Sequence, residues 1–129
     1  MSRTVQTPVH VRFGECDYYQ HVNNNVYLTY TDIGLSDFLR EIWPDLRKIQ
    51  YLVHIVHISI DFKSPATFDD HLIISTTLSH VGETSVTFKH TIVHRDTGIL
   101  VAEAKKVCVI LDSKTGKKCK VPKEFLEEK

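Results

Sequence analysis

Asn25–Ile42, with the sequence NVYLTYTDIGLSDFLREI, decides the fold, because it is the one long stretch of this chain with the periodicity of a helix. Apolar and aromatic residues such as Val26, Tyr30 and Ile33 recur along it at steps of three and four residues, and several asparagines before Val26 are candidates for the helix N-cap. Pro44 should end the helix, because the residue before a proline avoids the helical conformation. We therefore predict one helix over these residues.

The rest of the chain has the composition of strands. Before the helix, apolar residues alternate with polar residues and glycine, which predicts a half-buried strand over Val9–Phe13. After the helix, four segments rich in Val, Ile, Thr and Phe are separated by turn signals: Leu52–Phe62, His71–His80, Thr84–His94 and Leu100–Leu111. Their short loops predict an antiparallel meander, and Pro122 is expected to open a last helical turn.

One helix and five strands bury their apolar faces most economically if the sheet curls over the helix. We therefore predict an α+β fold, with a five-stranded antiparallel sheet curled around one long central helix, in a single domain over residues 1–129. Gly34 lies in the middle of the helix, where glycine costs ~1 kcal/mol relative to alanine. Either the sheet backbone approaches the helix closely there, or the helix tolerates the glycine.

Composition excludes several classes of protein. Sixteen basic residues balance sixteen acidic ones, so no global field favours DNA, RNA or an anionic membrane. The N-terminal residues lack the apolar core of a signal peptide, and no window approaches the ~18 consecutive apolar residues of a membrane span. We expect a cytoplasmic protein with neither nucleic-acid nor membrane partners. The three cysteines form no Cys-x-x-Cys pair and are expected to be free thiols.

The histidines do not predict a metal site. His54 and His57, like His90 and His94, match neither a His-Glu-x-x-His helix nor a strand pair with cysteine ligands nearby. We expect these strand histidines at the surface or at an interface, and no metal ligand among them.

The segment Asp17–Asn25, DYYQHVNNN, has the clearest chemistry in the chain. It brings a carboxylate and an imidazole to a helix N-terminus, whose orphan backbone N–H groups can hold a polarised carbonyl oxygen. Asp17 can then act as general base or nucleophile; alternatively it is only a turn or capping residue, since aspartate favours both. Alternation would send Cys16 to the face opposite Asp17, which disfavours a Cys/His nucleophile. The segment has the layout of an acyl-transfer site.

Several motifs together resemble a known family. Phe13–Asp17 (FGECD), His21–Asn24 (HVNN) and Tyr27 resemble the N-terminal motif of hotdog-fold acyl-CoA thioesterases of the 4-hydroxybenzoyl-CoA thioesterase-like group. The run Gln20–Asn24 is also similar to the active-site segment of plant acyl-ACP thioesterases. The resemblance covers nearly the whole chain, because it continues through further segments: Asp61–Ala66, Asp69–Leu72, Val81–Ser85 and Val121–Pro122.

The resemblance implies a hotdog fold and hydrolysis of an acyl-CoA thioester to a free acid and coenzyme A, without a metal or redox cofactor. It implies that the backbone N–H of Asn24 binds the oxyanion. For His21 three roles stay open: to position Asp17, to bind the thioester side, or only to hydrogen-bond a loop carbonyl. Lysines are candidate partners for the phosphates of coenzyme A. The catalytic candidates are Asp17 and His21, and the substrate-binding candidates are Asn24, Tyr27, Lys63, Ser64, Lys117 and Lys118.

Three departures from the family pattern concern the substrate. Gln20 stands where a glycine usually precedes His-Val-Asn-Asn, Asp32–Leu35 replaces a Glu-x-x-Arg pattern, and Gly82–Glu83 occupies the usual arginine-rich coenzyme-contacting turn. The acyl chain length, an aryl preference and the carrier, coenzyme A or acyl carrier protein, therefore stay open.

A lone protomer would leave a long exposed sheet edge, so we expect a homo-oligomer, a dimer or a dimer of dimers (a homotetramer), with sites at the protomer interface. Two other functions stay open. One is a hotdog enoyl-CoA hydratase or hydroxyacyl dehydratase, although this chain lacks the Gly-Asp-x-Asn-Pro-x-His pattern of that group. The other is a non-catalytic acyl-CoA-binding protein that uses the same pocket.

Overall fold

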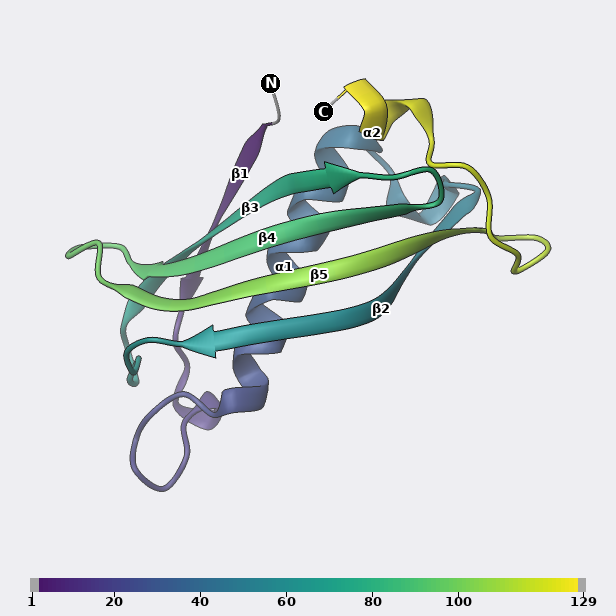
Figure 1. Cartoon of the computed structure of the whole chain (residues 1–129). Coiled ribbons are helices and arrows are strands. Elements are labelled where there is room, and N and C mark those ends of the chain that lie inside the picture. Colours follow the sequence, from purple (N-terminus) through teal and green to yellow (C-terminus); the bar gives the residue numbers. More distant parts are fainter. Residues whose placement is uncertain (1–2, 128–129) are drawn as a thin grey trace.

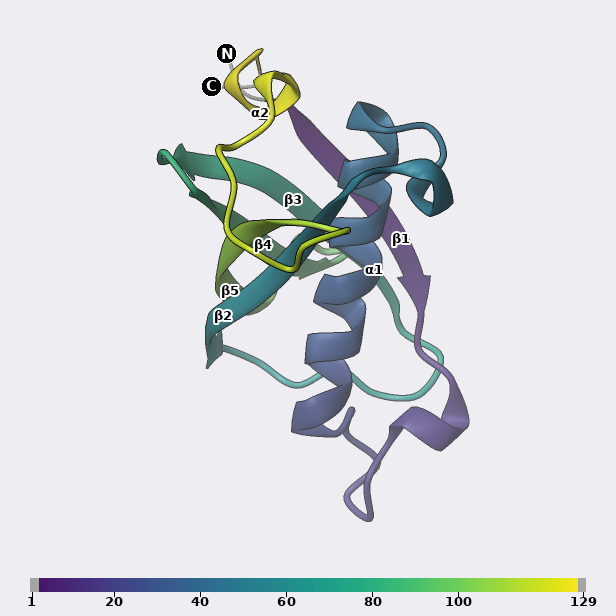
Figure 2. The same cartoon turned by 90° about the vertical axis from the view of Figure 1, so that its right-hand side faces the viewer.

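The helix α1, Asn24–Ile42, lies against one face of a five-stranded antiparallel sheet that curls around it (Figures 1 and 2). The structure is a computed structural model and describes residues 3–127. Trp43 closes the helix: its N–H bonds to the carbonyl of Leu39 at 2.7 Å, but its own backbone is extended ahead of Pro44, as predicted. Asn23 is the N-cap residue, yet its side chain makes no capping hydrogen bond.

The strands have the positions predicted from the sequence to within a residue or two, except the first. They are β1 (Thr4–His10), β2 (Tyr51–Phe62), β3 (His71–Val81), β4 (Ser85–His94) and β5 (Leu100–Asp112). A short helix, α2 (Lys123–Glu127), follows Pro122 as expected. Within residues 3–127, no helix is both long and apolar enough to cross a membrane.

The prediction of a first strand over Val9–Phe13 is correct only for Val9 and His10, and its C-terminal end is wrong. β1 pairs with β3, and β3 begins at His71, the partner of His10, so the residues after His10 have no strand beside them. Phe13–Glu15 instead form a 3-10 turn, η1, on the way to α1. The strand extends in the other direction, through threonine and glutamine residues that a hydrophobic pattern does not register.

The predicted meander is confirmed for β3, β4 and β5, which are antiparallel neighbours, but it is wrong for β2, because the strand order is β1-β3-β4-β5-β2. β2 pairs with β5 at one edge, and the eight-residue link after it, residues 63–70, carries the chain to β3 near the other edge. Hairpin loops usually have two to five residues, so this link is long enough to avoid a hairpin. It passes the start of α1, where the N–H of Val22 donates to the carbonyl of Ala66 at 2.9 Å.

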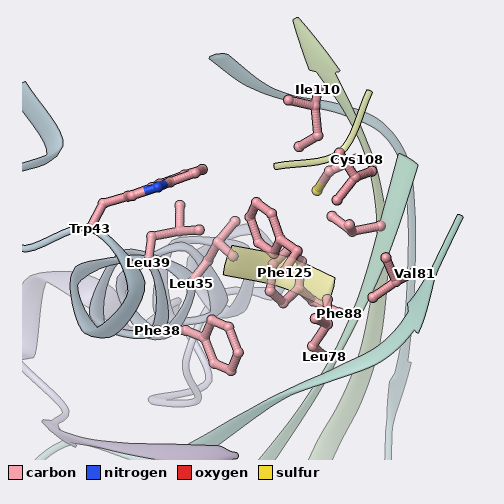
Figure 3. Packing of buried hydrophobic residues seen from close by; sticks show 12 residues of the cluster. Leu35, Phe38, Leu39, Trp43, Leu78, Val81, Phe88, Cys108, Ile110 and Phe125 are labelled. Carbon is pink, nitrogen blue, oxygen red and sulfur yellow. The ribbon is translucent and has the colours of Figure 1, made fainter. Parts of the chain in front are cut away.

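This arrangement confirms the predicted α+β class and the sheet curled around one helix. The core between them has two parts. One surrounds Phe38, Phe88 and Phe125, whose rings pack edge to face beside the C-terminal half of α1 (Figure 3). The other surrounds Tyr27 and Tyr30 beside the N-terminal half. The second part therefore supports the segment with the candidate catalytic residues.

Gly34 marks the closest approach of α1 to the sheet. A Cβ at this position would lie 2.6 Å from Oγ1 of Thr76 and 2.9 Å from Cγ2 of Ile74, both on β3. Of the two explanations for this glycine, the close approach is correct, although side chains of the sheet, rather than its backbone, occupy the space.

A polar layer lies between the two parts of the core. Lys106 on β5 is fully buried, and its Nζ donates to Oδ1 of Asp32 on α1 at 2.6 Å. Burial lowers the pKa of Lys106, and the hydrogen bond with Asp32 opposes that shift. Lys106 lies two residues from Ala104 and two from Cys108, both of which face inward. Residues two apart on a strand share a face, so the period-two pattern of β5 contains the signal for the burial of Lys106.

The expectation of a surface or interface position is wrong for His90, which is 1% exposed. Its Nδ1 shares a 2.9 Å hydrogen bond with the hydroxyl of Thr76, while its Nε2 has no partner in the described part of the chain. Burial, and secondarily the charge of Lys106, lower the pKa of His90 to about 3 from an ordinary 6.5. The imidazole is therefore neutral in the folded protein.

The buried His90 should make the fold sensitive to acid. Its pKa is lower in the folded than in the unfolded state, so the unfolded state takes up the proton first, and stability should fall as the pH drops from about 6.5 towards 3. Between pH 7 and pH 5 we expect this residue to remove about 2 kcal/mol from the free energy of unfolding. Urea unfolding at both pH values measures the effect.

His90→Asn, which keeps a partner for Thr76 but does not titrate, should lose that part of the pH dependence. His54→Asn, on an exposed residue of β2, is the matched control and should behave like wild type. An equal fall in stability for His90→Asn and wild type would show that another group is responsible.

Candidate active site

The loop between η1 and α1 is closed by its own backbone. The N–H of Asp17 donates to the carbonyl of His21 at 2.8 Å, and the N–H of Gln20 donates to the carbonyl of Asp17 at 2.9 Å. This closure puts Gln20 in the left-handed region, at φ +67°. A glycine enters that region without steric cost, which explains the glycine of the family pattern at this position.

The carboxylate of Asp17 is held by one of its two oxygens. Oδ1 accepts hydrogen bonds from the N–H of Tyr19 at 2.9 Å and of His21 at 3.2 Å. Oδ2 has no hydrogen-bond partner among residues 3–127. The loop therefore fixes the carboxylate and leaves one oxygen available to water or to a substrate.

Asp17 opens onto a cavity of about 310 Å³ between the loop, the start of α1 and the end of β2. Six of the eight predicted site residues line it: Asp17, His21, Asn24, Tyr27, Lys63 and Ser64. The structure thus brings together most of the predicted residues, although Asp17 and Ser64 are 47 positions apart in the sequence.

The start of α1 contributes a backbone donor to this cavity. Asn24 is the first helical residue, and its N–H has no partner in the portion that the structure describes. Asn23 before it is extended (φ −60°, ψ 142°). Asn24, which carries this N–H at the positive end of the helix dipole, lines the same cavity as Asp17, and a backbone donor at a helix start can stabilise a negatively charged oxygen.

Tyr27 and Ser64 tie the cavity walls together. The hydroxyl oxygen of Tyr27 accepts a hydrogen bond from the N–H of Ala66 at 3.3 Å, and burial raises the pKa of Tyr27, so the phenol stays neutral. The hydroxyl of Ser64 donates to the carbonyl of Leu100. Both contacts hold the link after β2 in place.

The role predicted for His21 takes a different form. Its backbone N–H helps to hold Asp17, but its imidazole makes no hydrogen bond with any residue from 3 to 127. The imidazole is exposed and lines the cavity. Positioning of Asp17 is thus a task of the backbone of His21, and its side chain is free for another contact.

Lys117 and Lys118 do not line this cavity in a single chain, and their assignment as substrate-binding residues, at a site shared between protomers, stays a prediction. The N–H of Lys63 bonds to Val101 near the start of β5, whereas Lys117 bonds to Asp112 at its other end. These points are about 35 Å apart along the strand (Figure 1). These lysines were proposed as partners for the phosphates of coenzyme A from their charge alone, and the charge of a residue does not indicate where along a sheet the residue lies.

Three wall residues were missed, namely Val22, Phe62 and Pro65. Phe62 ends the predicted β2 segment, and its ring centroid lies 5.5 Å from that of Tyr27. Its place directly before Lys63 is the sequence signal that could have identified it. The neighbouring thiol of Cys16 is a poor nucleophile, because burial raises its pKa.

The chain has clear relatives among known proteins. A family model described as "Thioesterase-like superfamily" matches residues 11–128. The long-chain acyl-CoA thioesterase FadM of Escherichia coli is 31% identical over 128 residues, which cover 96% of each chain.

Two solved structures have the same fold. The probable thioesterase YbaW of Escherichia coli has a TM-score of 0.84 at 30% identity, over 95% of this chain and 94% of its own. A 4-hydroxybenzoyl-CoA thioesterase in complex with 4-hydroxybenzoyl-CoA has a TM-score of 0.89 at 20% identity, over 98% of this chain and 99% of its own. These likenesses confirm the predicted hotdog fold.

Proposed function

Because this chain belongs to the thioesterase-like superfamily and is an acyl-CoA thioester hydrolase, we propose that Asp17 and the start of α1 carry out the hydrolysis. One observation supports this assignment above all. Asp17, whose carboxylate has a free oxygen, and Asn24, whose backbone N–H has no partner among residues 3–127, line the same cavity.

In the proposed reaction, the thioester carbonyl oxygen accepts a hydrogen bond from the N–H of Asn24. The carboxylate of Asp17 either takes a proton from an attacking water or attacks the carbonyl carbon itself. The negative charge that develops on the oxygen is stabilised by the N–H and the helix dipole. The carbon–sulfur bond then breaks and coenzyme A leaves. If water was the nucleophile, the other product is the carboxylic acid directly. If Asp17 was the nucleophile, the other product is a mixed anhydride with Asp17, which water then hydrolyses to the carboxylic acid and the free Asp17 carboxylate.

His21 is proposed as the group that returns a proton to the leaving thiolate. Its imidazole lines the cavity and is engaged by no other residue of the described chain. Coenzyme A is a good leaving group, so this step makes only a modest demand on the acid. Lys63 is proposed to bind a phosphate of coenzyme A as a point charge at the mouth of the cavity.

We propose a fatty acyl chain, rather than an aryl group, as the substrate's acid portion. FadM, the relative at 31% identity, is named for long-chain acyl-CoA. The test is hydrolysis of short, medium, long and aromatic acyl-CoAs, followed by the release of free thiol. Release that increases with chain length supports the proposal, whereas preferential release from the aromatic thioesters contradicts it.

The same assay separates the alternative functions. Hydration of crotonyl-CoA without thiol release would identify a hydratase, and tight binding without turnover would identify a binding protein. Thiol release only from acyl thioesters of acyl carrier protein would show that the substrate's carrier is acyl carrier protein rather than coenzyme A.

We propose hydrolysis without a metal or redox cofactor, so addition of EDTA to the assay should leave the rate of hydrolysis unchanged. The cytoplasmic location stays a prediction, which cell fractionation tests.

We also propose that two copies of the chain pair along β2. This strand is an edge of the sheet, and large apolar side chains are exposed along its 12 residues: Leu52 (49%), Val56 (54%), Ile58 (39%) and Phe62 (46%). An unpaired edge with such side chains is a template for a second strand. Because the cavity lies at the end of β2, a partner would form part of its wall. Pairing of such dimers would give the tetramer.

Val56→Lys should therefore convert the oligomer into monomers, because a charge at an edge opposes strand pairing. Light scattering after size-exclusion chromatography measures the mass. Leu126→Lys, on an α2 residue of similar exposure (50%), is the control and should keep the mass of wild type. An unchanged oligomer in Val56→Lys would mean that the copies associate through another surface.

A further inference from the structure

We propose that the groove between Phe13 and Phe68 binds the hydrocarbon chain of the acyl group. The proposal rests on the proposed function, because it concerns the acid portion of the same thioester. It assigns the two arms of the substrate to two separate cavities that share Asp17.

The groove is a second cavity, of about 480 Å³, which shares Asp17 with the first cavity. It is lined by Phe13, Gly14, Cys16, Asp17, Gln20 and Phe68. This volume lies in the range of about 300–1,000 Å³ that is usual for small-molecule sites. Apart from Asp17 and Gln20, its wall is apolar.

The two phenylalanines form a fixed pair although they come from different segments. Phe13 lies in η1 and Phe68 in the link after β2, and their rings meet edge to face at a centroid distance of 5.7 Å. Backbone hydrogen bonds join the two segments, since Val11 bonds to Asp70 at 2.9 Å and Asp69 bonds to Val11 at 3.1 Å. The groove is therefore held open by the fold.

Both rings are far more exposed than aromatic side chains usually are. Phe13 is 74% exposed and Phe68 is 52% exposed. Grouped apolar side chains at a surface mark a place where another apolar group binds. Their position beside Asp17 makes the substrate itself the nearest candidate.

The chemistry of the two cavities distinguishes the two arms of a thioester. The cavity with Asn24 also contains Lys63 and His21, which suit the charged and polar coenzyme A arm. The groove has neither lysine nor arginine in its wall. A thioester carbonyl carbon has the sulfur of coenzyme A on one side and the hydrocarbon arm on the other. Because Asp17 lines both cavities, a thioester bound at Asp17 with its coenzyme arm in the polar cavity has the groove beside its hydrocarbon arm.

The test is the dependence of kcat/KM on acyl chain length in wild type and in the double variant Phe13→Ala/Phe68→Ala. Burial of each methylene should raise kcat/KM of wild type about fourfold until the groove is filled. In the double variant this dependence should flatten, with a loss of at least about tenfold for the longest chain and no loss for acetyl-CoA. Leu126→Ala, matched to Phe68 in exposure, should behave like wild type.

A binding measurement separates this proposal from the proposed function. Titration calorimetry of acyl-CoAs of increasing length, with Asp17→Asn and with the triple variant Asp17→Asn/Phe13→Ala/Phe68→Ala, does not require turnover. Affinity that increases with length only when both phenylalanines are present supports the groove, even if wild type hydrolyses none of the compounds.

Equal dependence on chain length with and without the two phenylalanines would overturn the proposal. A change of oligomer mass in Phe13→Ala/Phe68→Ala, with chain-length dependence intact, would also overturn it and would identify the groove as a contact between copies of the chain. The melting temperature of each variant establishes that it is folded.

Discussion

Asp17→Asn is expected to lower the turnover of acyl-CoA at least about a hundredfold, with the fold and the oligomer unchanged. The asparagine side chain keeps an oxygen for the N–H groups of Tyr19 and His21, so the loop should keep its shape. It loses the negative charge, and an amide neither accepts a proton from water nor attacks a thioester. The measurement is thiol release under saturating substrate.

Asp69→Asn is a suitable control for this prediction. Asp69 is an exposed carboxylate outside both cavities, and its φ of +73° is one that asparagine accepts. The turnover of the Asp69→Asn variant should match that of wild type. A near-normal rate for Asp17→Asn would remove Asp17 from the mechanism. Transfer of ¹⁸O from labelled water into Asp17 during turnover would identify it as a nucleophile rather than a base.

Asn24→Pro is expected to lower turnover by about 10²–10³-fold, because it deletes the backbone N–H that binds the oxyanion. The fold should accept this change. Asn24 is the first residue of α1, where proline is favoured, and the extended backbone of Asn23 suits a residue before proline. Circular dichroism and urea unfolding should therefore match wild type, while kcat falls.

Asn24→Ala is the matched variant, since it removes the side chain and keeps the N–H. Its effect on kcat should be much smaller than that of Asn24→Pro. Equal losses in the two variants would assign the role to the side chain or to a general disturbance of the helix start, and the backbone oxyanion site would be wrong.

Much of the fold could be predicted because local patterns determine it. The helix stops before Pro44, and β2 to β5 agree with the predicted segments to within a residue. The order of the strands could not be predicted in this way. Strand periodicity is the same in any order, and the turn signal at Ser64–Pro65 does not distinguish a hairpin from a link that crosses to the other edge.

The candidate site was predictable where its residues are near one another in the motif, from Asp17 to Tyr27. The distance of Lys117 and Lys118 from this cavity in a single chain could not be predicted, because only pairing along β5 reveals that they lie at its far end, and their role in substrate binding stays a prediction. The pairs of His90 with Thr76 and of Lys106 with Asp32 could not be predicted, because the two partners come from different elements. The burial of Lys106 itself was overlooked in the alternation along β5.

The link at residues 63–70 bears on how this fold tolerates change over evolution. Its first three residues form a wall of the catalytic cavity. Ala66 in its middle is hydrogen-bonded to Val22 and Tyr27, and Phe68 near its end lines the groove. Surface connections usually tolerate insertions and deletions. Here a single added residue would displace both cavities relative to Asp17. We therefore expect the length of this link to be under the same selection as the catalytic residues, and changes of substrate preference that involve this link to be replacements rather than insertions or deletions.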